Sequence, residues 1–328
     1  MNRLLCHHEY GTPENVVKLS EGEFPTMGHD EILIKTTMAP INPADLNIIE
    51  GRYGDQPPLP VTLGNEGVGI IEKIGADVTE LSIGDQVITP TLRGTWSEYR
   101  SCKAEEAVRV PHDIPPEVAC MLTVNPLTAI LMLESFHELK PEEYVLQNAA
   151  NSGVGRAVID IAKRMGIKTI NIVRTHEQVE EVEKIGGSIQ LTFDDLKAKR
   201  YPSNLRKLSI PLALNAVGGE SARLITRLLS HGGTMVTYGA MSKEPVILDN
   251  GPLIYKNISI KGFWRSEWVR RVDFELVKSM MERLILLAEH GAFVVPIEKI
   301  YPFSDAAEAL KHAKRSGRAG KILLSPRS

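Results

Sequence analysis

The chain has 328 residues, which is enough for about two domains of ordinary size. It carries 38 Lys and Arg against 41 Asp and Glu, a net charge of −3, and 43% of its residues are hydrophobic. This composition excludes a disordered chain. The lack of a basic excess argues against a general nucleic-acid or membrane-surface binder.

Cysteine content and the amino terminus bear on the compartment. Three cysteines, Cys6, Cys102 and Cys120, are too few for a disulfide framework, and no two have the C-x-x-C spacing of a metal clip. The first residues lack the apolar stretch of a signal peptide and the repeated arginines of a transit peptide. A cytoplasmic protein in a reducing compartment is therefore expected, with a processed organellar protein as the alternative.

The first 120 residues are rich in short strand-like runs separated by glycine and proline. Gly-Ala-Asp at 75–77 and Gly-Asp at 84–85 are typical of tight turns between strands. The pattern predicts a twisted β domain, with strands at 31–36, 68–74 and 86–89.

From about residue 121 short apolar runs alternate with helical patterns. A strand at 144–147 leads through a glycine-containing loop into a helix that ends at Gly166, and a second helix ends at 186–187. Further strands are predicted at 169–173, 211–217, 234–239 and 258–263. Such alternation buries a parallel sheet between two layers of helices.

The remaining chain no longer alternates. A long helical pattern at 274–287 is followed by an alanine-rich helix at 306–313 and a strand-like run at 321–324. Because the alternation of strands and helices ends at Phe263, we assign this tail to the first domain. The predicted domains are 1–120 with 267–328, and 121–266.

The run Asn-Ala-Ala-Asn-Ser-Gly-Val-Gly at 148–155 lies where a dinucleotide-binding loop must lie, between a strand and a helix. Glycines at such a turn let the backbone approach a pyrophosphate, which the helix N-terminus then binds. Ser152 occupies the usual first glycine position, so only Gly153 and Gly155 remain. The alternative is a strand-to-helix turn with no ligand.

The end of the next strand bears on the choice of cofactor. An NAD site places an acidic residue there for the ribose 2′-hydroxyl, but the chain has Arg174, Thr175 and His176. An arginine can pair with a 2′-phosphate, so NADPH is favoured over NADH. The alternative is a solvated arginine at a strand end.

A chain with a β-rich first half and a dinucleotide-binding second half also suggests a zinc alcohol dehydrogenase. Zinc needs three Cys or His ligands, but Asn65 stands where a His ligand is expected, and residues 41–47 hold neither Cys nor His. His7 and His8 are adjacent and isolated, as expected of surface residues. We therefore predict a metal-free site.

Several motifs resemble those of the medium-chain dehydrogenase/reductase superfamily, and within it of the 2-enoyl thioester reductases that reduce enoyl-CoA or enoyl-acyl-carrier-protein. They cover nearly the whole chain: INPADLN (41–47), GRYG (51–54), GNEGV (64–68), VNPLTA (124–129), QNAANSGVG (147–155), LNAVGG (214–219), GGTMVTYG (232–239) and KGFW (261–264). The resemblance implies an α/β fold, a Rossmann doubly wound parallel sheet for NADPH plus a GroES-like β-rich catalytic domain.

The resemblance also assigns roles to residues. It implies that Tyr53 is the catalytic tyrosine, in place of the packing residue that a lone tyrosine in a loop more often is. The positions that would line the NADPH site are Asn125, Asn151, Ser152, Gly153, Val154, Arg174, Thr175, His176, Tyr238, Gly239, Ala240, Met241, Phe263, Trp264 and Lys321. His176 stands where the family tends to have a second arginine, so 2′-phosphate affinity is expected to weaken above about pH 7, where a histidine ring is neutral.

The chemistry expected is hydride addition to the β-carbon of an α,β-unsaturated thioester, with charge moving onto the carbonyl oxygen. A phenol is ordinarily protonated at neutral pH, so Tyr53 can donate to that oxygen and protonate the α-carbon. No metal or covalent nucleophile is needed. Arginines 265, 270 and 271 could meet the phosphates of coenzyme A or an acidic carrier protein, although a solvated helix start is the commoner meaning of such a run.

Two other functions stay open at this stage. One is an NADPH-dependent quinone or alkenone reductase of the same superfamily, and the other is an NADPH-binding protein without turnover. Residues 246–248 and 258–263 could leave an exposed sheet edge, which predicts a homodimer.

Overall fold

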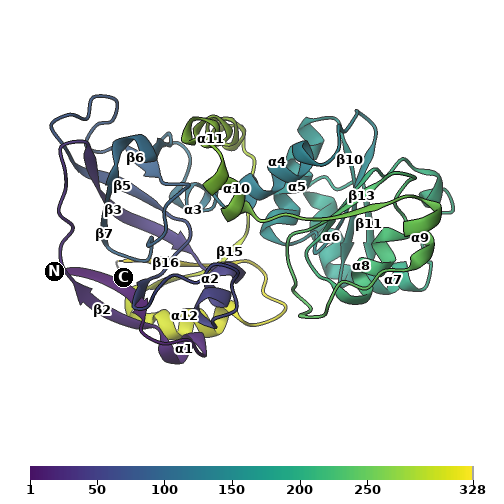
Figure 1. The fold of residues 1–328 in the computed structure, drawn as a ribbon, viewed down its shortest axis with the longest axis horizontal. Helices are drawn as coiled ribbons and strands as arrows, with labels where there is room; N and C mark the ends of the chain where they lie inside the picture. The colour runs from purple at the N-terminus through teal and green to yellow at the C-terminus, as the bar shows by residue number, and fades with distance from the viewer. Residues whose placement is uncertain (327–328) are drawn as a thin grey trace. The chain divides into compact units, whose positions relative to one another are not determined.

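The structure, a computed structural model, describes residues 1–326. The chain divides into two compact units, which Figure 1 shows in one ribbon. Unit 1 contains Met1–Val124 and the chain from Trp268 onward, and unit 2 contains Asn125–Glu267. The sequence placed these divisions after residues 120 and 266.

Unit 2 is built on a six-stranded sheet in which every neighbouring pair is parallel, in the order β11-β10-β9-β12-β13-β14. Its strands are β9 (Tyr144–Asn148), β10 (Lys168–Val173), β11 (Ile189–Thr192), β12 (Leu212–Asn215), β13 (Thr234–Thr237) and β14 (Ser259–Gly262). Its helices are α4 (Asn125–Ser135), α5 (Gly153–Arg164), α6 (His176–Lys184), α7 (Phe193–Lys197), α8 (Gly219–Thr226) and α9 (Asn250–Tyr255). Strands and helices alternate along the chain (Figure 1), as a doubly wound α/β fold requires.

The predicted strands of this sheet are present, with ends that differ from the expected ones by at most two residues. In the runs at 211–217 and 234–239, the strands β12 and β13 each end two residues earlier than predicted, because the chain turns away from the sheet there. Those turns begin at the carboxyl ends of the strands, where a doubly wound sheet binds ligands.

Unit 1 is mostly antiparallel. A seven-stranded sheet has the order β15-β16-β3-β5-β6-β8, with β7 paired to β3, and a smaller sheet has the order β2-β1-β4. Its strands are β1 (Asn2–His7), β2 (Lys18–Gly22), β3 (Glu31–Pro40), β4 (Val61–Thr62), β5 (Val68–Ile74), β6 (Gln86–Ile88), β7 (Tyr99–Lys103), β8 (Val108–Arg109), β15 (Ile297–Pro302) and β16 (Lys321–Ser325).

The helices of unit 1 are α1 (Pro13–Val16), α2 (Pro43–Ile49), α3 (Pro116–Ala119), α11 (Phe274–Glu289) and α12 (Ala306–Ala313), and α10 (Arg265–Arg271) lies across the second division. The carboxyl-terminal tail joins unit 1 through β16, which pairs with β3 at Leu323–Pro40 and Leu324–Ala39. Since β3 belongs to the first stretch of sequence, unit 1 is discontinuous in the chain.

Each unit has its own apolar core. In unit 1 the Trp96 side chain is fully buried with Leu5, Phe303 and Leu310, and its indole N–H donates to the Pro40 carbonyl at 3.3 Å. In unit 2 Leu146, Ile170 and further buried aliphatic side chains fill the space between sheet and helices. Within residues 1–326 no helix is both long and apolar enough to cross a membrane.

The expectation that His7 and His8 both lie at the surface is wrong for His7. His8 lies just outside β1 and is exposed, while His7 at the end of β1 is fully buried. The His7 ring bonds through Nδ1 to the Glu9 carbonyl at 2.9 Å. A local hydrogen bond thus satisfies one ring nitrogen of this buried histidine.

Candidate active site

The carboxyl ends of β9 and β12 meet where the strand order of unit 2 reverses. From β9 the chain proceeds to β10 and β11 on one side, and from β12 to β13 and β14 on the other. Asn148 joins the two ends: its Nδ2 donates to Asn215 Oδ1 at 2.8 Å, and its Oδ1 accepts from the Ala216 N–H at 2.7 Å. This reversal is where open α/β sheets bind nucleotides.

The glycine-containing loop leaves β9 at this point and starts α5. Ser152 caps the helix, its Oγ accepting from the Gly155 N–H at 3.2 Å. A Cβ on Gly155 would lie 2.5 Å from the Ala150 carbonyl oxygen, so only glycine allows this close approach. The first N–H groups of α5 have no acceptor within the helix, and with the helix dipole they suit a pyrophosphate.

Asn125 lies beside this loop, at the start of α4. A Cβ on Gly153 would lie 2.9 Å from the Asn125 Nδ2 atom, which shows how closely the Asn125 side chain approaches the loop. The structure therefore brings together Asn125 and Gly153, two residues assigned to the cofactor site from motifs far apart in the sequence.

Arg174, Thr175 and His176 lie at the carboxyl end of β10, which pairs with β9 at Ile172–Asn148. All three are exposed, and Thr175 caps α6. Gln178 fixes the turn, since its side-chain oxygen accepts from the Arg174 N–H at 3.0 Å. This hydrogen bond therefore holds the backbone from which the Arg174 side chain extends, next to the glycine loop.

Arg156 supports the same region, although the sequence did not point to it. It is 7% exposed on α5, and it donates to the Asn151 carbonyl at 3.1 Å and to Glu181 of α6 at 3.0 Å. One side chain thus ties the loop to the two helices that follow β9 and β10.

Residues 238–241 form the turn after β13 and lie against β12. The N–H groups of Tyr238 and Met241 donate to the carbonyls of Asn215 and Ala216, at 3.0 and 2.9 Å. A Cβ on Gly239 would lie 3.0 Å from the Ala216 carbonyl oxygen. Burial raises the pKa of the Tyr238 phenol, with the Ser152 hydroxyl opposing the shift, so this phenol is neutral at physiological pH.

Phe263 and Trp264 follow β14 at the same edge of the sheet. The Phe263 N–H donates to the Thr237 carbonyl at 3.0 Å, and its ring meets Phe136 edge-on at 5.9 Å between centroids. Apart from Asn125, which lies beside the glycine loop at the start of α4, the predicted cofactor residues of unit 2 follow the carboxyl ends of strands of one sheet.

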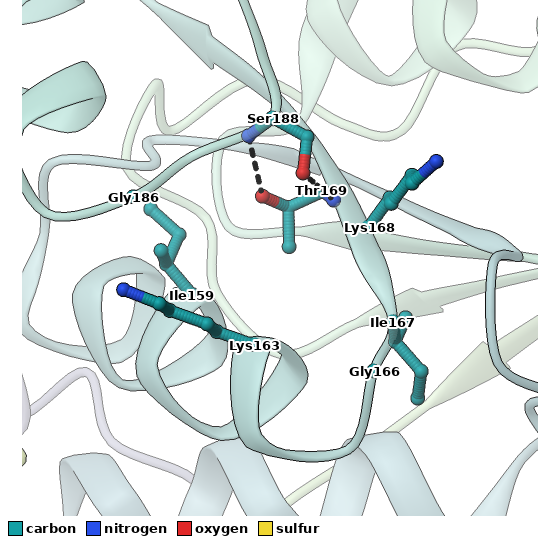
Figure 2. Close-up of a pocket in the computed structure, with 8 residues that line it drawn as sticks. All are labelled: Ile159, Lys163, Gly166, Ile167, Lys168, Thr169, Gly186 and Ser188. Atoms are coloured by element: carbon teal, nitrogen blue, oxygen red, sulfur yellow. Dashed lines mark hydrogen bonds between the residues drawn. The ribbon is translucent and has the colours of Figure 1, made fainter.

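Figure 2 shows a cavity of about 210 Å³ at the opposite edge, where Lys168 and Thr169 begin β10. The Lys163 and Lys168 ammonium groups point in different directions in this view and do not converge on a common point. Lys168 is already paired with Glu142. This cavity does not belong to the candidate nucleotide site.

Tyr53 belongs to unit 1, in a loop that follows α2. Gly51 has a φ of +72° and packs against the Tyr10 ring, so the chain turns sharply before Tyr53. Gln56 Nε2 donates to the Tyr53 carbonyl at 3.1 Å. Asp55, two residues on, pairs with Arg93 at 3.1 Å and with Arg270 at 3.4 Å.

These ion pairs show one use of the basic run 265–271. Arg270 holds the loop that carries Tyr53, so it is not simply a solvated charge. The structure places Tyr53 and Lys321 in unit 1 and the other predicted site residues in unit 2.

Lys321 is 9% exposed at the start of β16, and its ammonium donates to the Asn42 side-chain oxygen. Burial lowers the pKa of Lys321, and the nearby Glu66 carboxylate opposes that shift. Asp45 and Glu66 are each 1% exposed in the same region. The members of this buried charged cluster come from distant parts of the chain, so the motifs that contain Asp45 and Glu66 do not show that these residues lie near Lys321. The assignment of Lys321 to the cofactor site remains a prediction.

Asn65 stands where a zinc ligand was expected, and it serves a hydrogen-bonding role. Its Nδ2 and its backbone N–H donate to Asp45 Oδ1, at 2.6 and 3.1 Å. An amide that donates in this way offers a metal no nitrogen lone pair. Across residues 1–326 no cluster of three or more His, Cys, Asp or Glu side chains could hold a metal ion.

Comparison with known proteins identifies two families along the chain. The alcohol dehydrogenase GroES-like domain matches residues 28–112, and the zinc-binding dehydrogenase family matches residues 153–284. The second family is named for zinc binding. In this chain, however, Asn65 stands at the position in the first domain where a histidine ligand was expected. The α/β fold with a GroES-like domain is confirmed.

The human mitochondrial enoyl-acyl-carrier-protein reductase is 37% identical over 98% of this chain and 88% of its own length. Among solved structures, the Etr1p complex with NADP and crotonyl-CoA has a TM-score of 0.87, with 26% identity over 99% of both chains. The Escherichia coli quinone oxidoreductase complexed with NADPH has a TM-score of 0.84, with 25% identity over 99% of this chain and 100% of its own.

These names correct one expectation. The cytoplasmic location inferred from the amino-terminal residues is contradicted by relatives that are mitochondrial in human and in Dictyostelium discoideum. The apolar and arginine patterns used for that inference report only on leader peptides. With these similarities over nearly its whole length, the chain belongs to the mitochondrial-type enoyl-acyl-carrier-protein reductases of the medium-chain dehydrogenase/reductase superfamily.

Proposed function

We propose that the protein reduces the 2,3 double bond of a 2-enoyl thioester with NADPH. The observation that carries this proposal is the 37% identity to an enoyl-acyl-carrier-protein reductase over 98% of the chain. The Etr1p complex, with NADP and crotonyl-CoA bound to the same fold, supports both the cofactor and the substrate class. The reaction is an oxidoreduction at a carbon–carbon bond.

The residues of unit 2 fit the cofactor. The glycine loop and the start of α5 would bind the pyrophosphate, and Arg174 with Thr175 and His176 would bind the 2′-phosphate. The close approach at Gly155 is the structural feature that such binding needs. Bound NADPH supplies the hydride for the substrate β-carbon.

Tyr53 would complete the reaction. Its phenolic O–H donates a hydrogen bond to the thioester oxygen, where negative charge develops, and then protonates the α-carbon. The Gly51 turn and the pairing of Asp55 with two arginines hold the loop that presents it. Ordering the loop in advance reduces the entropy lost when the substrate binds.

A quinone reductase is the second candidate, because the Escherichia coli quinone oxidoreductase shares the fold. NADPH oxidation with crotonyl-CoA and with a simple benzoquinone would separate the two activities. We expect the thioester to give the higher kcat/KM. Fast quinone reduction without thioester reduction would contradict the proposal.

Replacing Arg174 with alanine is expected to weaken NADPH binding about 30-fold and to leave NADH binding unchanged. The reason is that only NADPH has the phosphate with which the exposed guanidinium pairs. Titration of protein fluorescence with each cofactor measures both affinities. Lys163→Ala, at the opposite edge of the sheet, is the matched control and should change neither. Equal losses for NADH and NADPH would contradict the assignment.

The substrate's carrier is either coenzyme A or an acyl carrier protein, and α10 provides positive charge for either. Arg271 is exposed, while Arg270 is engaged with Asp55. Replacing Arg271 with glutamate would raise KM for a carrier-protein thioester more than for crotonyl-CoA if the acidic carrier protein binds here. A larger rise in KM for crotonyl-CoA would point instead to the phosphates of coenzyme A.

The open edge of the unit 2 sheet supports a homodimer. β14 is the last strand of that sheet, and exposed apolar side chains lie on α9 and on the segment before it. Their exposed fractions are 37% for Val246, 44% for Ile247, 68% for Ile254 and 81% for Tyr255. Covering them would protect both the edge and the apolar patch. Light scattering at micromolar concentration should give a dimer, and Ile254→Asp a monomer; a monomeric wild type would reject the proposal.

We also place the protein in mitochondria, as its relatives' names indicate. Subcellular fractionation followed by immunoblotting tests this, and recovery in the cytosolic fraction alone would contradict it.

A further inference from the structure

The buried charged cluster of unit 1 joins four segments of that unit. Its members are Asn42 (2% exposed), Asp45 (1%), Asn65 (5%), Glu66 (1%), Thr123 (1%) and Lys321 (9%). They come from the start of α2, the segment before β5, the segment before α4, and β16. Burying charges and amides is costly unless each is hydrogen-bonded, so a cluster of this kind calls for a purpose.

Glu66 is the centre of the cluster, because its two oxygens bind different segments. Oε1 accepts from Asn42 Nδ2 at 2.7 Å. Oε2 accepts from the Val124 N–H at 2.8 Å and from the Thr123 hydroxyl at 3.2 Å. A single carboxylate thus links the residue that begins α2 to the end of the first stretch of unit 1.

Asn42 connects the cluster to α2, the helix that precedes Tyr53 in the chain. Asn42 precedes α2, and its own N–H is held by Asp45 Oδ2 at 2.8 Å. At the other end of this helix the Arg52 N–H donates to the Asn47 carbonyl at 2.8 Å, so the chain is still tied to α2 one residue before Tyr53. A shift of Asn42 would therefore be passed along the short helix to the Tyr53 loop.

Val124 connects the cluster to Asn125, one of the predicted cofactor residues, which follows it directly in the chain. Val124 is the last residue of unit 1 before the chain enters α4, and the next residue is Asn125. Holding the Val124 N–H fixes the point from which the chain leaves unit 1. Glu66 therefore holds both Val124 and the start of α2, the helix that precedes Tyr53.

The orientation of Asn42 is also fixed. The Lys321 ammonium has only donors, so the side-chain oxygen of Asn42 must face it and the Nδ2 group must face Glu66. The cluster therefore has one hydrogen-bond arrangement, running from Lys321 through Asn42 to Glu66 and on to Thr123 and Val124.

We propose that Glu66 is a positioning residue for the reduction, which holds the helix of Tyr53 and the chain entering Asn125 in fixed relation through Asn42 and Val124. The inference rests on the proposed function of Tyr53. It assigns Glu66 no contact with substrate or cofactor.

The test uses the full-length protein with a substitution that keeps the shape of the side chain. Glu66→Gln places an amide N–H₂ against a donor on one side, either Asn42 or Val124, so one of the two links breaks. We expect kcat with crotonyl-CoA to fall about tenfold while KM for NADPH stays within about twofold.

The double variant Asn42→Asp, Glu66→Gln offers a rescue. The carboxylate introduced at position 42 would accept from both Lys321 and the new amide, and the amide oxygen at position 66 would accept from Val124 and Thr123. Every hydrogen bond is restored and the charge of the cluster is unchanged, so kcat should return to within about twofold of the wild type.

Gln86→Leu is the matched control. Gln86 is 3% exposed in unit 1 and donates to the carbonyls of Pro111 and Ile114, at 3.2 and 3.1 Å, so its loss removes two buried hydrogen bonds elsewhere. It should lower Tm but leave kcat unchanged. Equal losses of kcat in Glu66→Gln and Gln86→Leu would show that Glu66 acts only through stability, and would overturn the proposal.

Hydrogen–deuterium exchange separates this proposal from the proposed function. Glu66→Gln should speed exchange of the amides at 51–52 and at Val124, and the double variant should restore slow exchange. Unchanged exchange at these positions would overturn the positioning role whatever the activity. A wild type that does not reduce crotonyl-CoA would instead overturn the proposed function, while the exchange result would still report on the links made by Glu66.

Discussion

Replacement of Tyr53 with phenylalanine is expected to lower the kcat for crotonyl-CoA about 100-fold or more and to leave NADPH affinity unchanged. The substitution removes only the phenolic oxygen, which would stabilise the developing enolate and supply the proton for the α-carbon. Removing a general acid of this kind ordinarily costs about two to four orders of magnitude in rate. Steady-state NADPH oxidation gives kcat, and fluorescence titration gives the affinity for NADPH.

A second tyrosine provides the control for this experiment. Tyr10 packs against Gly51 in the same loop region and is 44% exposed. Because its ring makes the contact with Gly51, Tyr10→Phe keeps the packing and should leave kcat at the wild-type value. If Tyr53→Phe behaves like Tyr10→Phe, Tyr53 has no part in the chemistry and the proposed mechanism fails.

The fold could be predicted well from the sequence because its signals are local. Gly166 and Gly186, both with positive φ, lie two residues beyond the last residues of α5 and α6, and both were identified as ends of helical patterns. The alternation of strands and helices then dictates a parallel sheet. The short edge strand β11 has no distinctive pattern of its own, and the sequence analysis did not locate it.

The cofactor edge was also accessible from the sequence, since each of its motifs follows a strand. The carboxyl ends of parallel strands share one edge, so residues such as Arg174 and Tyr238 could be assigned to it one by one. Arg156 was missed because an arginine within a helix resembles a solvated surface residue. Only the fold reveals that it bonds to Asn151 and Glu181.

The buried cluster could not be predicted by such local reasoning. Glu66 lies 24 residues from Asn42 and 58 from Val124, and Lys321 lies 279 residues from Asn42. Asn42 and Glu66 lie within motifs that carry the family resemblance, but those motifs do not show that the two side chains are buried together. The approach of Lys321 to these residues depends on the antiparallel pairing of β16 with β3, which brings the carboxyl-terminal segment back to the first part of the chain.

Asp45 gives this cluster a measurable dependence on pH. Burial raises the pKa of the Asp45 carboxyl to about 6 from its ordinary 3.8, and the nearby Glu66 carboxylate acts in the same direction. Hydrogen bonds from Asn42 and Asn65 oppose this shift without cancelling it. A carbon-13 titration of the side-chain carboxyl, assigned by its loss in Asp45→Asn, should give a midpoint near that value.

The same shift predicts how stability changes with pH. Between the two pKa values the folded protein retains a proton that the unfolded chain has released, so raising the pH removes stability from the wild type. Asp45→Asn has no such proton to lose. Its free energy of unfolding, relative to the wild type, should therefore rise by about 2 kcal/mol between about pH 4 and pH 7, whatever the constant cost of placing an amide at this position.

Urea unfolding of the wild type and each variant at several pH values measures this difference, followed by tryptophan fluorescence, to which Trp96 contributes from unit 1 and Trp264 from unit 2. Asp195 provides a control of opposite sign. Its hydrogen bond from Thr192 lowers its pKa, so the stability it contributes is lost as the pH falls. Relative to the wild type, the free energy of unfolding of Asp195→Asn should therefore fall as the pH rises, whereas that of Asp45→Asn should rise. A constant difference between Asp45→Asn and the wild type across this range would show that Asp45 ionises normally, and that the cluster carries its full negative charge at all these pH values.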